Sequence, residues 1–193
     1  MCTLITGGRE YKSLFGVTAH ELAHSWFHHL LGTNEAKYAW MDEGFTSFYD
    51  MLCEAEILGT EDPYSSFYNR YYQLVNSGVE EPLTTHADRF QYNFAYGVAS
   101  YSKGAVFLAQ LGYIIGAKNL MKTIKRYYEV FQFSHPTPND FKRIAEKVSG
   151  MQLEWYLNDW VRTTNTIDYG IRQVEKKDQK TKITLERIGN LPM

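Results

Sequence analysis

The sequence predicts a mainly α protein, with a short strand at its N-terminal end and a β-hairpin at its C-terminal end. Apolar residues recur with helical spacing from residue 17 to residue 162, and glycines mark the ends of several of these segments. After Thr163 the pattern changes to alternating apolar and polar residues. The chain has 193 residues, 44% of them hydrophobic, which is enough to form one core.

Each element follows from a local signal. The β-prone residues 2–6 end at Gly7-Gly8, which predicts the N-terminal strand. Asp62 followed by Pro63 is typical of a helix start, and we expect a long loop over residues 79–95. Helices are predicted over residues 17–31, 42–58, 63–77, 97–115, 117–131, 139–149 and 151–162.

The C-terminal residues differ in character from the rest of the chain. Residues 167–189 have the pattern of two strands that turn at Lys177-Asp178. A lone hairpin is only marginally stable in water, so we expect this one to open a following β domain. We therefore divide the chain into a helical domain, residues 1–163, and the beginning of a β domain, residues 164–193.

Charge and composition argue against several classes of partner. The chain has 20 basic and 22 acidic residues, a net charge of −2, so we expect no nucleic-acid partner. No apolar run approaches the ~20 residues that span a bilayer, so we expect no membrane partner. The two cysteines are too few for a disulfide framework, and they leave the cellular compartment undecided.

The strongest functional signal is the segment HELAHSWF. His20 and His24 are four residues apart, so on a helix both imidazoles lie on one face and can bind one zinc ion. Glu21 is rotated by about 100° from His20. It therefore lies beside the metal, where a base for a zinc-bound water is needed. The alternative, on this motif alone, is an exposed amphipathic helix with scattered histidines.

A third ligand is available in the next predicted helix. Catalytic zinc has three protein ligands and one open position, and Glu43 is placed to be the third. The segment before it is long enough to return along the ~10 Å of helix that follows His24. Asp50 lies seven residues after Glu43 on the same helix face. It can hold the second ring nitrogen of His20 or His24, and Asp42 competes for this role.

These motifs resemble those of the gluzincin zinc aminopeptidases, the group of aminopeptidase N and leukotriene hydrolase. HELAHSWF and WMDEGF match at the family's spacing, and YGVASYSKGAVFLAQL is similar to its Tyr-x-Lys-Gly segment. LEWYLNDWVRT, IDYGI and KITLERIGNLPM resemble the family's closing helix and the first strands of its β-sandwich. The resemblance implies the helical part of a thermolysin-like (zincin) catalytic domain, and it places Tyr101 at the catalytic tyrosine.

The sequence departs from the family in two places. The Gly-x-Met-Glu-Asn segment, whose glutamate holds the substrate's free amino terminus, is not present. We therefore expect an N-terminally truncated fragment that is weakly active or inactive and that can self-associate. The family's usual Gly-Asn after Trp-Phe is replaced by His28-His29. His28 would continue the face of His20 and His24, and we interpret it as a polar or core histidine rather than a ligand of a second metal.

Three functions remain open. The first is a zinc metallopeptidase that acts on peptides, an aminopeptidase in the full-length protein. In it Glu21 moves the proton of the zinc-bound water and Tyr101 stabilises the oxyanion. The second is a zinc endopeptidase of the same class. The third is a non-catalytic, zinc-stabilised helical interaction module, which would need a fourth ligand that no histidine or cysteine is placed to supply. Arg89 and Lys103 are interpreted as ordinary solvated cations.

Overall fold

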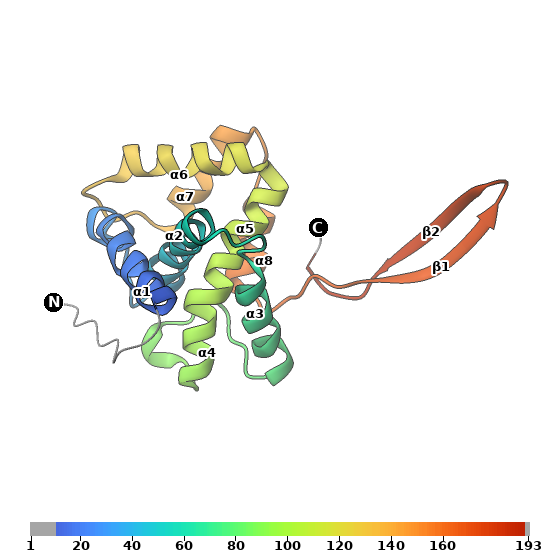
Figure 1. Ribbon diagram of the computed structural model, residues 1–193, viewed down its shortest axis with the longest axis horizontal. Helices are drawn as coiled ribbons and strands as arrows, with labels where there is room; N and C mark the ends of the chain where they lie inside the picture. Colours follow the sequence, from blue (N-terminus) through green and yellow to red (C-terminus); the bar gives the residue numbers. More distant parts are fainter. Residues whose placement is uncertain (1–10, 192–193) are drawn as a thin grey trace.

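The computed structural model describes residues 11–191, with side chains from Leu14 onward. The helices form one body, and the two strands form a hairpin that projects from it (Figure 1). The predicted fold class, mainly α with a C-terminal hairpin, is confirmed; the strand predicted at residues 2–6 lies outside the described residues. The helices are α1 (Tyr11–Ala23), η1 (Ser25–Leu30), α2 (Ala39–Leu58), α3 (Ser65–Ser77), η2 (Ala87–Arg89), α4 (Asn93–Gly97), η3 (Val98–Lys103), α5 (Gly104–Ile115), α6 (Ala117–Phe131), α7 (Pro138–Ser149) and α8 (Glu154–Arg162).

The predicted bounds of the first helix, residues 17–31, are wrong at both ends. The chain is already helical at Tyr11, and the regular helix α1 stops at Ala23 instead of continuing to residue 31. The following turn, η1, is π-helical and contains a kink. Phe27 has φ −118° and ψ 81°, and His28 has φ −140° and ψ 39°, so both lie outside the helical region. This break decides where the side chains after His24 can reach.

Other boundaries differ by a few residues. α3 begins at Ser65, because the Asp62 carboxylate accepts a hydrogen bond from the Tyr64 amide in a turn that precedes the helix. α8 begins at Glu154 rather than at residue 151. The loop predicted over residues 79–95 contains η2 and the start of α4. The single helix predicted over residues 97–115 contains the π-helical turn η3.

The hairpin consists of β1 (Tyr169–Lys177) and β2 (Lys180–Arg187), which pair antiparallel. Its turn lies at Asp178-Gln179, one residue later than predicted. Both turn residues have positive φ, 48° and 62°, as a two-residue turn that follows the strand twist requires. The apolar side chains of the hairpin are more than half exposed at Ile171, Val174, Ile183 and Leu185. The division of the chain at residues 163 and 164 stays a prediction.

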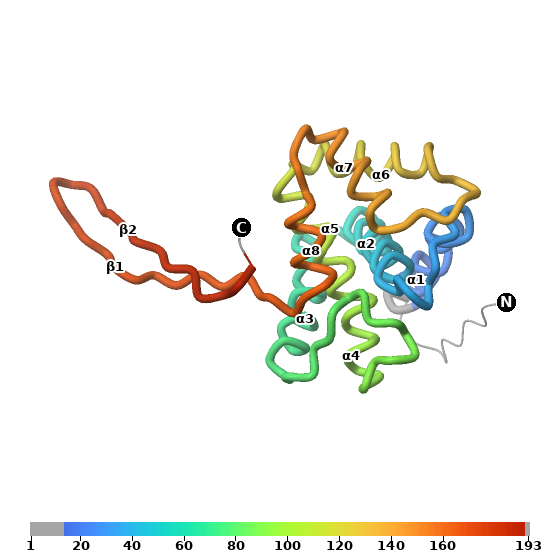
Figure 2. Tube along the Cα trace, turned by 180° about the vertical axis from the view of Figure 1, so that it is seen from behind, coloured from blue at the N-terminus to red at the C-terminus, as the bar shows by residue number. Residues whose placement is uncertain are grey.

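α2 forms the centre of the helical body, with α1 on one side and α5 on the other (Figure 2). Its aromatic residues Trp40, Phe45 and Phe48 are each only 1% exposed, and they pack against rings from α5, from α7 and from the residue that precedes α3. No described helix is both long and apolar enough to cross a membrane.

Two glycines let α2 touch the helix that carries Tyr101. A Cβ added at Gly44 would lie 2.6 Å from Gly104 Cα, and one added at Gly104 would lie 2.8 Å from Gly44 Cα. Only backbones without side chains can approach this closely. The contact sits next to Glu43 on one helix and three residues after Tyr101 on the other, so it sets the spacing of these two side chains.

The prediction that Lys103 is a solvated cation is wrong. Its side chain is fully buried, and Nζ lies 2.7 Å from Oε1 of Glu80, whose side chain is 7% exposed. Nζ also lies 3.4 Å from the carbonyl oxygen of Thr163 and 5.7 Å from the centroid of the Tyr71 ring. A buried ammonium is retained only where it is paired in this way, so Lys103 ties η3 to the loop after α3.

The contact between the two glycines is testable. We expect Gly44→Ala to lower the free energy of unfolding by about 1–3 kcal/mol, because the added methyl meets backbone rather than a movable side chain. The matched control is Gly97→Ala, where a Cβ meets nothing within 4 Å. In a helix this exchange should be neutral or stabilising by up to about 1 kcal/mol. Urea unfolding measures both variants, and equal stability of Gly44→Ala and the wild type would contradict the close approach.

Candidate metal centre

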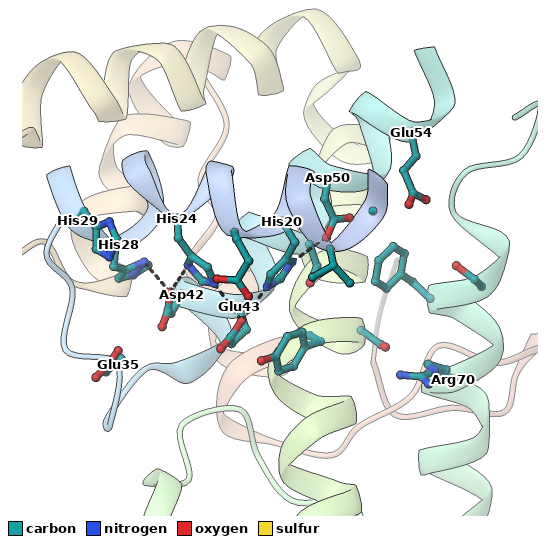
Figure 3. A pocket seen from close by; sticks show the side chains of 18 residues that line it. His20, His24, His28, His29, Glu35, Asp42, Glu43, Asp50, Glu54 and Arg70 are labelled. Atoms are coloured by element: carbon teal, nitrogen blue, oxygen red, sulfur yellow. Dashed lines mark hydrogen bonds and ion pairs between the residues drawn. The ribbon is translucent and has the colours of Figure 1, made fainter. Parts of the chain in front are cut away.

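Two histidines and a glutamate from neighbouring helices converge on one point (Figure 3). His20 and His24 lie one turn apart at the end of α1, and Glu43 lies in the second turn of α2. Glu43 Oε2 is 3.1 Å from His20 Nε2 and 3.4 Å from His24 Nε2. One ligand atom from each residue lies within 4.8 Å of the other two, which is close enough to hold one metal ion.

The other ring nitrogen of each histidine is held from behind. His20 Nδ1 lies 2.7 Å from Asp50 Oδ2. His24 Nδ1 lies 2.8 Å from the Phe27 carbonyl oxygen and 3.0 Å from Asp42 Oδ1. Acceptors at both Nδ1 atoms fix the tautomers and turn the two Nε2 atoms toward Glu43. Histidine ligands of metals are supported in this way, so the donor set fits a zinc ion.

Both carboxylates considered in the sequence lie behind the histidines. Asp50 contacts His20, and Asp42 contacts His24, so the structure places one behind each ring instead of selecting between them. Their side chains are 16% and 11% exposed, respectively. Low exposure strengthens these hydrogen bonds, because little water competes for the carboxylates.

Hydrogen bonds around the three predicted ligands favour the charged form of each side chain. Burial lowers the pKa of His20, but hydrogen bonds to Asp50 and Glu43 outweigh it and raise the pKa to about 9. Hydrogen bonds to Asp42 and Glu43 raise the pKa of His24 to about 10. Burial would raise the pKa of Glu43, but hydrogen bonds from both histidines and Tyr101 bring it down to about 2. The arrangement stabilises an ionised carboxylate beside cationic partners.

Tyr101 lies against the same group. Its ring stacks on His20 with centroids 5.5 Å apart and an angle of 17° between the planes. Burial and then the charge of Glu43 raise the pKa of the Tyr101 hydroxyl well above its usual range, so it remains a hydrogen-bond donor. The structure therefore places the predicted tyrosine beside the predicted ligands.

A cavity of about 1110 Å³ opens onto this group. Glu21 lines the cavity but is not a member of the three-ligand group, as its position on the helix predicted. Besides histidines, the described residues that line the cavity include one basic side chain, Arg70, and six carboxylates. The carboxylates are Glu21, Glu35, Asp42, Glu43, Asp50 and Glu54.

Two contacts of His24 were not predicted from the sequence. Thr46 Oγ1 donates a hydrogen bond to the Phe27 carbonyl at 2.8 Å and lies 3.3 Å from His24 Nδ1. Helical spacing could have indicated Thr46, which follows Glu43 by three residues and shares its face. The contact with the Phe27 carbonyl could not have been predicted. In an unbroken helix this oxygen would accept a hydrogen bond from a backbone amide, and it can accept one from a side chain here because the helix breaks.

The sequence is similar to those of known zinc-peptidase family members. The Peptidase family M1 domain matches residues 4–160. Aminopeptidase M1-A of Oryza sativa subsp. japonica is 26% identical over 170 residues, which cover 85% of this chain and 19% of that protein. Glutamyl aminopeptidase of Homo sapiens is 26% identical over 180 residues, which cover 85% of this chain and 18% of that protein. The chain thus spans about a fifth of the length of these curated relatives.

Solved structures show the same fold. An M1 zinc metallopeptidase from Deinococcus radiodurans has a TM-score of 0.67 at 24% sequence identity, over 84% of this chain and 34% of that one. A mutant of an M1 zinc metallopeptidase from the same organism, bound to a Tyr-Ser-Ala substrate, also has a TM-score of 0.67, at 22% identity, over 83% of this chain and 34% of that one. The resemblance expected from HELAHSWF and WMDEGF is confirmed, and the chain belongs to peptidase family M1.

Proposed function

We propose that this chain carries the metal centre of a zinc-dependent peptidase that removes amino-terminal residues from peptides. The observation that carries the proposal is the pair of imidazoles that turn Nε2 toward Glu43 while acceptors hold both Nδ1 atoms. The names of the curated relatives, which are aminopeptidases, support the substrate class. The residue roles below are part of the proposal.

His20, His24 and Glu43 would hold the zinc ion. Zinc bound there would supply a Lewis acid that polarises a carbonyl group and lowers the pKa of a water molecule. Glu21 lines the cavity outside the ligand group, so its carboxylate is free to take a proton from water and to pass it to the leaving amine. The Tyr101 hydroxyl stays protonated and would donate a hydrogen bond to the developing oxyanion.

The alternatives differ in testable ways. The metal-ligand group contains three of the described residues and faces an open cavity, which favours a catalytic over a structural zinc site.

An endopeptidase of the same class would cleave a peptide regardless of its amino terminus. Comparing one peptide with a free and an acetylated amino terminus separates the two activities, and we expect only the free peptide to be cleaved.

Metal content tests the centre itself. We expect one zinc per chain after dialysis against buffer with a low, controlled zinc concentration, and none in His24→Ala, because two ligands do not retain the ion. His86→Ala is the matched control, since His86 lies outside the cavity. Atomic emission spectroscopy gives the ratio. A wild type without zinc, or His24→Ala with a full equivalent, would refute the assignment.

Glu21→Gln should keep its zinc and lose hydrolysis. The amide preserves shape but cannot accept a proton, and removing a general base typically costs 10²–10⁴-fold in rate, so we expect a loss of about this size. The assay uses a fluorogenic aminoacyl amide and long incubations, so that a loss of this size can be measured. Turnover at the wild-type rate in the zinc-loaded variant would assign the base to another residue.

Tyr101→Phe should lower kcat by about 10²–10³-fold with little change in KM, because the hydroxyl is needed where negative charge develops. Its zinc content should equal that of the wild type. Tyr72→Phe, which alters a tyrosine that is 54% exposed, serves as the control and should change neither constant. Equal kcat values for Tyr101→Phe and the wild type would remove Tyr101 from the mechanism.

A further inference from the structure

The chain after His24 does not continue as a helix, and this break brings two groups to the metal centre. The altered backbone at Phe27 turns its carbonyl oxygen toward His24 Nδ1, 2.8 Å away. The altered backbone at His28 turns its side chain toward Asp42 on α2 (Figure 3). In an unbroken helix His28 would instead lie one turn beyond His24 on the same face.

His28 is buried without a hydrogen bond. Its side chain is 7% exposed, and neither ring nitrogen has a hydrogen-bond partner among the described residues. Burial lowers the pKa of His28 to about 4, so the imidazole is neutral and carries one N–H. Unpaired polar atoms in such a place destabilise the folded protein, because they lose their hydrogen bonds to water. A side chain kept there at this cost calls for a contact that compensates for it.

Asp42 supplies a polar contact to His28. Its Oδ1 atom lies 3.4 Å from His28 Nδ1 and 3.0 Å from His24 Nδ1, so one carboxylate oxygen lies between the two rings. That oxygen has lone pairs enough to accept from both N–H groups. The distance of 3.4 Å between His28 Nδ1 and Asp42 Oδ1 is about 0.2 Å beyond the upper end of the usual N–H···O range.

We propose that His28 is a positioning residue for the metal centre, which acts by holding the Asp42 carboxylate against His24. The chain of contacts runs from His28 to Asp42, from Asp42 to His24 Nδ1, and ends at the Nε2 atom that faces Glu43. The inference rests on the proposed zinc centre. It gives a role to a histidine that the proposed mechanism does not otherwise use.

Zinc affinity, measured by competition with a chromophoric chelator, tests the role without a need for activity. His28→Phe keeps a ring but removes both nitrogens, and we expect zinc to bind about 10-fold more weakly, as on loss of other outer partners of histidine ligands. His28→Asn places an amide donor near the position of Nδ1 and should bind within about 3-fold of the wild type. His29→Phe, a neighbouring variant on the cavity wall, should bind as the wild type does.

A double-mutant cycle tests whether the effect passes through Asp42. In an Asp42→Asn background, His28→Phe should produce no further loss of affinity. An equal loss in both backgrounds, or wild-type affinity of His28→Phe, would overturn the proposal. If His28→Phe does not fold, His28→Gln takes its place. The glutamine side chain is polar but has no donor near the position of Nδ1. His28→Gln should therefore bind zinc more weakly than His28→Asn. A wild type that binds no zinc would instead refute the metal centre.

Discussion

The carboxylate of Glu43 between two imidazoles is the interaction on which the rest of the site depends. It joins α1 to α2, and each of its partners is held from behind by another acceptor. A carboxylate and two imidazoles that are only 13–17% exposed need hydrogen-bond partners, so the surrounding helices must hold all three at fixed distances. The cavity, the stacked Tyr101 and the support from Asp42 and Asp50 are arranged around this group.

Packing sets those distances. Aromatic residues of α2 fill the core, and Gly44 lets α2 approach Gly104 backbone to backbone. The buried pair of Lys103 and Glu80 fixes the end of η3. Tyr101 is therefore followed directly by two fixed contacts, one at Lys103 and one at Gly104. Side chains held in this way need little rearrangement when charge develops nearby, which is the condition for electrostatic stabilisation.

Much of this arrangement could be predicted from the sequence, because it follows from helical periodicity. The spacing of His20 and His24 fixes their common face, and Asp50 falls on the face of Glu43 for the same reason. The break after His24 could not be predicted, since no proline or glycine marks it before Gly32. The Phe27 carbonyl, which depends on the break, was therefore missed. His28 has the low exposure expected of a core histidine, but its contact with Asp42 could not be predicted. Lys103 was misread because burial of a charge depends on a partner distant in sequence.

X-ray absorption at the zinc edge tests the central claim most directly, because it reports the ligands of the ion itself. The account predicts a four-coordinate ion with nitrogen and oxygen neighbours at about 2.0–2.2 Å and the outer scattering of two imidazole rings. Substituting His20 should remove the zinc signal altogether, because two ligands do not retain the ion. A spectrum with sulfur neighbours at about 2.3 Å, or without imidazole scattering, would contradict a centre built from His20, His24 and Glu43.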